Sequence, residues 1–186
     1  MANGEIKILM LGARRAGKTS LLAAVAETFK DESLKRHLII EEATPNDGSQ
    51  CTLSGKVDTF KKFLQECEGK IVLNYEDPTN TFHDYVIKVS LPGTIGEMQM
   101  TFTDANGEFY YQGDQRFEEI KQKILGYDVI IVAVDSVYLM ESVNAENDLC
   151  SKTLSDAYNQ VDSVHTLLSA LHDDNGKNAR LVIFAP

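Results

Sequence analysis

Three apolar runs stand out along the chain. They occupy residues 6–11, 129–134 (VIIVAV) and 181–184 (LVIF). Short runs of apolar residues without alternation are typical of strands that are buried on both faces of a parallel sheet. We therefore expect three strands at these positions, the first two in the centre of a sheet.

Apolar residues that recur every three or four positions predict helices between these strands. A helix over 18–29 follows the first strand directly, since its apolar positions are Leu21, Leu22, Val25, Ala26 and Phe29. The same spacing predicts helices around 60–67, 117–125 and 149–171. Strand, glycine turn and helix thus succeed one another at the amino-terminal end of the chain.

A strict alternation of apolar and polar residues predicts two further strands within 84–104. The turn sequence PGTIG separates them, so we expect the two strands to run antiparallel, and the second to end on Asp104. Residues 37–43 (HLIIEEA) fit either a short strand or the end of a helix. The whole pattern predicts an α/β fold with three layers, α/β/α, whose mainly parallel sheet contains one antiparallel strand. No repeat or linker divides the chain, so we expect a single domain over 1–186.

Composition and charge narrow the functional classes. The chain has 18 basic and 28 acidic residues, a net charge of −10, which disfavours nucleic acids and anionic membranes as partners. Its three cysteines are too far apart for a CxxC pair, and the sequence has no apolar stretch of the roughly 18 residues that a membrane-spanning helix needs. We expect a cytoplasmic protein without a membrane span.

The turn after the first strand carries the strongest chemical signal. Residues 12–19 read GARRAGKT and match the phosphate-loop pattern GxxxxGK(S/T). In such a loop the backbone amides of Gly12, Ala13, Arg14, Arg15, Ala16, Gly17, Lys18, Thr19 and Ser20 face a chain of phosphates. Lys18 is expected to reach the outer phosphates and the Thr19 hydroxyl to bind Mg²⁺, while the helix amino terminus favours the anion.

A second acidic element suggests which kind of phosphate-binding protein this is. Asp104 ends a predicted strand and Gly107 follows three residues later, in the sequence DANGE. Taken alone, Asp-Ala-Asn-Gly is also an ordinary turn sequence. In its context it resembles the DxxG motif of P-loop GTPases of the Ras-like and translation-factor class, because the order of predicted elements is also similar to that of the small GTPases. The long insert before the strand pair resembles the bacterial double-GTPase group.

This resemblance implies further site residues and ligands. Asp104 would hold Mg²⁺ through water, and the Gly107 amide would meet the γ-phosphate of GTP. The threonine of the first mobile segment would be Thr79 or Thr81. GTP, GDP and Mg²⁺ are the implied ligands, and a protein effector or regulator would recognise the mobile segments.

Two positions depart from the family pattern. Glu108 stands where small GTPases commonly have the glutamine that orients the attacking water, so slow hydrolysis is expected. Arg14 replaces a common glycine; it either folds over the phosphates as an internal arginine finger or is simply solvated.

The guanine-recognition motif of the family would follow the fifth core strand, and the sequence ends before it, so the chain is expected to be a truncated domain. Without that motif, two other functions stay open. One is a P-loop ATPase or nucleotide kinase, and the other is an assembly module that binds nucleotide without turnover.

Overall fold

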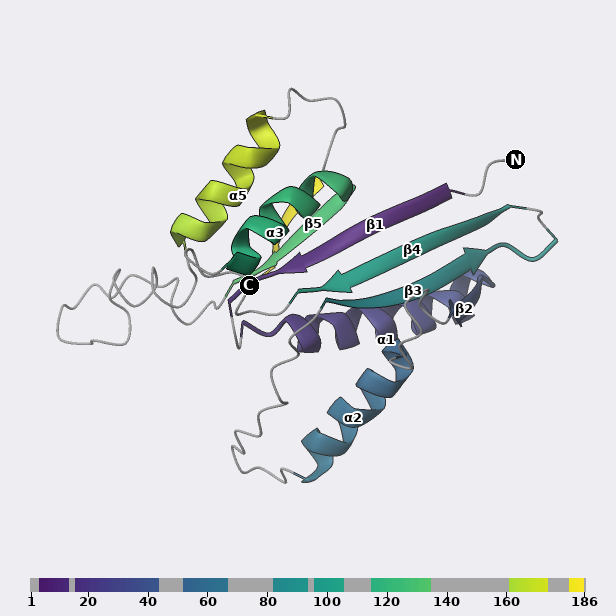
Figure 1. Ribbon diagram of the computed structural model, residues 1–186. Helices are drawn as coiled ribbons and strands as arrows, with labels where there is room; N and C mark the ends of the chain where they lie inside the picture. Colours follow the sequence, from purple (N-terminus) through teal and green to yellow (C-terminus); the bar gives the residue numbers. More distant parts are fainter. Residues whose placement is uncertain are drawn as a thin grey trace, which may run out of the picture. The chain divides into compact units, whose positions relative to one another are not determined.

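The computed structural model describes residues 4–13, 16–43, 52–66, 82–93, 96–105, 115–134, 161–173 and 181–185 (Figure 1). These residues form an α/β fold. Its elements are β1 (Gly4–Leu11), α1 (Lys18–Arg36), β2 (Ile39–Ala43), α2 (Leu53–Glu66), β3 (His83–Ser90), β4 (Glu97–Asp104), α3 (Gln115–Lys123), the short 3₁₀ helix η2 (Ile124–Gly126), β5 (Val129–Ala133), α5 (Val161–Asp173) and β6 (Leu181–Ala185).

The strands form a six-stranded mixed sheet in the order β2-β3-β4-β1-β5-β6. β3 is antiparallel to β2, with Glu42 opposite Ile87, and its arrow also runs opposite to that of β4 in Figure 1. β5 pairs in parallel with β1 and with β6; Ile130 lies opposite both Leu9 and Val182. The antiparallel pair within 84–104 and the buried parallel strands at 6–11 and 129–134 are therefore confirmed.

The chain divides into two compact units, and each is described by itself. Unit 1 comprises residues 1–6 and 19–103, and unit 2 comprises residues 7–18 and 104–186. The phosphate-loop sequence up to Lys18 and the acidic residue Asp104 belong to unit 2, whereas α2, β2 and β3 belong to unit 1.

In unit 1, α1 packs with the strands through Leu22, Tyr85 and Phe102, each at most 2% exposed. The Phe29 ring meets the Phe102 ring edge-on, with centroids 6.2 Å apart. This helix continues to Arg36, seven residues beyond the predicted end. His37 then adopts a positive φ of 53°, and the Leu38 amide donates to the Ser33 carbonyl at 3.1 Å, which closes the helix by a standard carboxyl-terminal turn.

In unit 2, the buried half of β1 and the strand β5 form the core together with α3, η2 and α5. Leu9 and Ile130 are completely buried, and so are Ile120 and Ile124. The start of β5 is fixed to β1 by two hydrogen bonds, in which the Lys7 amide donates to the Asp128 carboxylate at 2.8 Å and the Asp128 amide donates to the Lys7 carbonyl at 2.9 Å.

Several boundaries differ from those expected from the pattern. Residues 39–43 are a strand rather than a helix end, because they pair with β3. α2 begins at Leu53, earlier than its apolar residues suggested, and the described part of the last helix begins at Val161. Leu125 belongs to η2 and is 36% exposed, because the tighter 3₁₀ turn moves it off the apolar face that α3 buries.

Some apolar residues of the predicted strands are exposed. Leu91 and Met98 flank the turn between β3 and β4 and are 53% and 44% exposed. β6 stands at the edge of the sheet, and its residue Phe184 is 53% exposed. None of the described helices is long and apolar enough to cross a membrane.

Candidate functional site

The loop after β1 owes its shape to two glycines. Gly12 has a φ of 144° and Gly17 a φ of 82°, backbone conformations that side chains other than hydrogen rarely allow. Between them, the Ala16 amide donates to the Ala13 carbonyl at 3.2 Å, which makes a tight turn. The two glycines of the sequence motif therefore stand where the chain requires glycine.

Gly12 is also required by a close approach within unit 2. A Cβ atom built on Gly12 would lie 2.6 Å from the Ala133 carbonyl oxygen, at the end of β5. Real Cβ atoms essentially never come so near. A Cβ atom built on Gly17 would have no atom within 4 Å, so only the φ angle of Gly17 disfavours other residues.

Lys18 lies inside this loop rather than in solvent. It is 9% exposed, and its Nζ donates to the Gly12 carbonyl at 2.9 Å and to the Ala13 carbonyl at 3.1 Å. These bonds tie the first helical residue of α1 back to the end of β1. The loop therefore encloses an ammonium group, and carbonyl oxygens of the loop itself fix its position.

The positive charge of Lys18 is only partly compensated by the groups around it. Burial lowers the pKa of Lys18 below 10.5, and the nearby Asp104 carboxylate opposes that shift only in part. An ammonium group has three N–H donors, and the two loop carbonyls account for two of them. A buried cation that is incompletely compensated is stabilised by an added anion.

Asp104 is positioned by the end of β4. The Ala105 amide, directly after it, donates to the Met10 carbonyl at 3.3 Å, so the chain leaving β4 is bonded to the end of β1. Asp104 and Lys18 are close enough for their charges to interact. The structure thus brings together two of the residues that the sequence singled out, one from the phosphate loop and one from DANGE.

The beginning of α1 adds a favourable field for an anion. The backbone amides at the start of a helix have no partners within the helix and carry the positive end of its dipole. No acidic residue occupies the first turn of this 19-residue helix, so α1 itself places no carboxylate at that end. Thr19 and Ser20 lie in this turn, Thr19 half-buried and Ser20 exposed. Together with Lys18, these features suit the loop to bind a phosphate or a similar anion.

A hydroxyl and a carboxylate are the oxygen ligands that Mg²⁺ prefers, so the types of residues at Thr19 and Asp104 fit this ion. Among the described residues, no three His, Cys, Asp or Glu side chains are grouped so that they could hold a metal ion. A magnesium site of the phosphate-loop type does not depend on such a group, because phosphate oxygens and water complete its coordination.

The other predicted site residues lie outside the described part of the chain. They are Arg14, Arg15, Thr79, Thr81, Gly107 and Glu108. Their assignments stay predictions.

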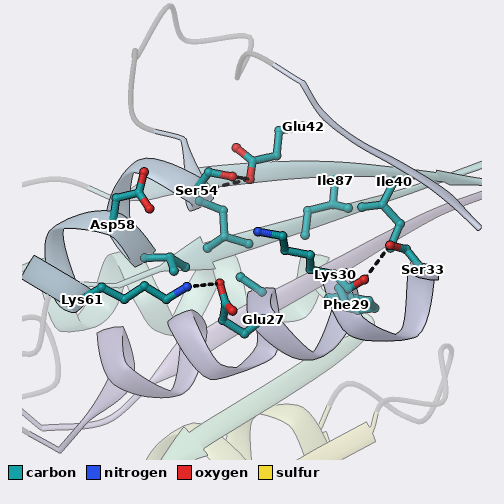
Figure 2. Close-up of a pocket in the computed structure, with 13 residues that line it drawn as sticks. Glu27, Phe29, Lys30, Ser33, Ile40, Glu42, Ser54, Asp58, Lys61 and Ile87 are labelled. Carbon is teal, nitrogen blue, oxygen red and sulfur yellow. Dashed lines mark hydrogen bonds and ion pairs between the residues drawn. The ribbon is translucent and has the colours of Figure 1, made fainter. Parts of the chain in front are cut away.

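A second feature was not predicted by the sequence. Unit 1 contains a hollow of about 420 Å³ that is lined by residues of α1, α2, β2 and β3 (Figure 2), and we call it the α1–α2 hollow. Its polar residues include Lys30 and Asp58, which look like ordinary surface charges in the sequence. Only the placement of α2 against α1 brings both into the lining of one hollow, so no local signal could have identified them.

Comparison with known proteins does not indicate a function for the chain. No model of a protein family matches the chain, and no match was found among curated proteins. A functional conclusion therefore depends on the geometry of the loop and on the residues in it.

Proposed function

We propose that the chain is a Mg²⁺-dependent GTP-binding domain that hydrolyses GTP slowly and acts as a switch. The observation that carries this proposal is Lys18, a buried ammonium enclosed by loop carbonyls at the junction of β1 and α1, with Asp104 nearby. A buried lysine with a purely structural role would be most stable if its charge were fully compensated. Here compensation is partial, which favours a site for an anionic ligand.

Each described residue has a definite task in this proposal. The Lys18 ammonium binds oxygens of the terminal phosphates, and the amides at the start of α1 bind the inner ones. Thr19 and Asp104 hold Mg²⁺, which neutralises charge that develops on the phosphates. Gly12 and Gly17 let the backbone come close to the ligand without a side chain between them.

We infer the preference for guanine and the switching behaviour from the resemblance to small GTPases. DANGE supports it, because Asp104 ends β4 as that class requires. Slow hydrolysis is inferred from Glu108, whose charge beside the γ-phosphate is unfavourable for orienting the attacking water. In that class two switch segments order around the γ-phosphate and present a surface to a protein partner, and the corresponding positions of this chain would be Thr79 or Thr81 and Gly107.

Calorimetric titration of non-hydrolysable GTP and ATP analogues, with Mg²⁺, tests the proposal. We expect saturable binding at one site with preference for guanine. Lys18→Ala should weaken it about 10- to 150-fold, from the roughly 1.5–3 kcal/mol of a hydrogen bond to a charged group. Thr19→Ala should abolish the part of the affinity that depends on Mg²⁺. Preference for adenine would instead support an ATPase or nucleotide kinase on the same loop.

Two variants on the same helix serve as controls. Lys35→Ala removes a lysine that is paired with Glu32 on the surface, and Thr28→Ala removes a hydroxyl that donates to the Ala24 carbonyl. Both should bind nucleotide as the unaltered chain does. Unchanged affinity in Lys18→Ala and Thr19→Ala would refute the proposal. Nucleotide binding without any phosphate release, even at high protein concentration, would support the binding site but would favour an assembly module over an enzyme.

A further inference from the structure

Buried polar side chains are few in the described part of the chain, and two of them belong to the candidate site or adjoin it. Among the described residues they are Lys18, Thr103 and Ser163. Lys18 belongs to the phosphate loop, and Thr103 directly precedes Asp104. A buried hydroxyl costs free energy unless it is hydrogen-bonded, whereas valine has a similar shape and carries no such cost. The threonine at position 103 therefore needs a physical reason.

A short hydrogen bond joins Thr103 to the neighbouring strand β3. The Thr103 hydroxyl, which is almost completely buried, donates to Asp84 Oδ1 at 2.6 Å. A hydroxyl bond to a carboxylate at this length is charge-assisted and roughly twice as strong as a bond between neutral groups. Thr101, two residues earlier on the same face of β4, makes no side-chain hydrogen bond to any described residue. The bond is thus specific to position 103.

The bond lies at the end of β4 that leads to the candidate site. Asp84 is the second residue of β3, and Thr103 is the last residue but one of β4. Figure 1 shows the start of β3 and the arrowhead of β4 at the same end of this strand pair. The hydrogen bond therefore ties the final residues of β4 to β3, within unit 1.

Asp104 ends β4, so no further residue of that strand follows to hold its backbone. The next amide, that of Ala105, donates to the Met10 carbonyl at 3.3 Å, which is longer than the roughly 2.7–3.2 Å of most backbone hydrogen bonds. A side chain that holds a metal ion must be kept within about 0.5 Å of its working position. Order at the end of β4 therefore limits how well Asp104 can hold Mg²⁺.

We propose that the hydrogen bond between Thr103 and Asp84 positions Asp104 for Mg²⁺. Successive side chains of a strand point to opposite faces, so Thr103 acts through the backbone of β4 and not by contact with the ion. Thr103 and Asp84 are then positioning residues. This inference rests on the proposed function, because it concerns the same magnesium site.

Calorimetric titration of a non-hydrolysable GTP analogue, once with Mg²⁺ and once with EDTA, tests the proposal. The quantity compared is the ratio of the two affinities, which we call the Mg²⁺ gain. Thr103→Val removes the hydroxyl and should lower the Mg²⁺ gain about tenfold, at the lower end of the effects known for residues that support metal ligands. The affinity in EDTA should stay the same, because Lys18 and the loop amides bind the phosphates without this hydrogen bond.

Further variants separate positioning from a merely structural role. Thr103→Ser keeps the hydroxyl and should keep the Mg²⁺ gain. Thr101→Val is the matched control on the same face of β4 and should also keep it. Asp84→Ala removes the acceptor and should lower the Mg²⁺ gain as much as Thr103→Val does. The double variant should lose no more than either single variant, because both substitutions remove the same hydrogen bond.

A structural role alone would lower the affinities with Mg²⁺ and with EDTA by the same factor and leave the Mg²⁺ gain unchanged. That result in Thr103→Val, or a double variant in which the two losses multiply, would overturn the inference while the nucleotide site stands. Asp84→Ala provides the test by itself if circular dichroism shows that Thr103→Val does not fold. Absence of a Mg²⁺ gain in the unaltered chain would instead refute the proposed function, and the inference with it.

Discussion

Replacement of Gly12 by alanine tests why the phosphate loop begins with glycine. The added Cβ would lie 2.6 Å from the Ala133 carbonyl oxygen, and the backbone would keep a φ of 144°. Strain at such an angle costs about 1–3 kcal/mol for a residue with a side chain. Moving β5 away from the loop to relieve the contact would weaken about one backbone hydrogen bond, a further cost of about 1 kcal/mol.

We therefore expect Gly12→Ala to lower the free energy of unfolding by about 2–4 kcal/mol, a large part of the roughly 5–15 kcal/mol of a typical domain. Urea denaturation followed by circular dichroism measures it, as a lower midpoint at an unchanged slope. Gly93→Ala is the matched control. Gly93 has a φ of 77° and nothing near its Cβ position, so its replacement should cost only about 1–2 kcal/mol.

Gly17→Ala separates the cost of a positive φ angle from the cost of a close contact in the same loop. Gly17 has a φ of 82° and open space around its Cβ position, so the loss of stability should match that of Gly93→Ala. If Gly12→Ala destabilises the chain no more than these two variants, the contact with Ala133 is not what requires glycine.

Two further predictions concern polar contacts of unit 1. Thr103→Val removes the buried hydroxyl that donates to the Asp84 carboxylate at 2.6 Å, and it should cost about 1–2 kcal/mol in urea denaturation, whereas Thr101→Val on the same strand should cost less. The Glu27 carboxyl should titrate below pH 4.5 in an NMR experiment, because its hydrogen bond with Lys61 lowers its pKa. A carboxyl with a lowered pKa stabilises the fold above pH 4.5, and this contribution is lost as the pH falls through the lowered value. Lys61→Met should return the pKa towards 4.5, and an unchanged pKa would show that the ion pair does not persist in solution.

Local patterns were enough to predict most elements. The apolar runs at 6–11 and 129–134 are strands β1 and β5, and GxxxxGKT stands at the junction of β1 and α1 as the sequence indicated. Such signals depend on residues one to four positions apart, which is the range over which helices and strands repeat. The glycine positions of the loop could be predicted for the same reason, because their φ angles are local properties.

Long-range contacts decided the rest. Residues 39–43 form a strand because they pair with β3, and no pattern within HLIIEEA could have predicted that pairing. The bonds from Lys18 to two loop carbonyls, the charge of Asp104 nearby and the contact of Gly12 with Ala133 join residues that lie between 5 and 121 positions apart. Burial determines the pKa of Lys18 and the character of the α1–α2 hollow, and burial is a property of packing. The sequence by itself specified the chemical groups and their local geometry, and only the tertiary structure placed them where their charges and surfaces act together.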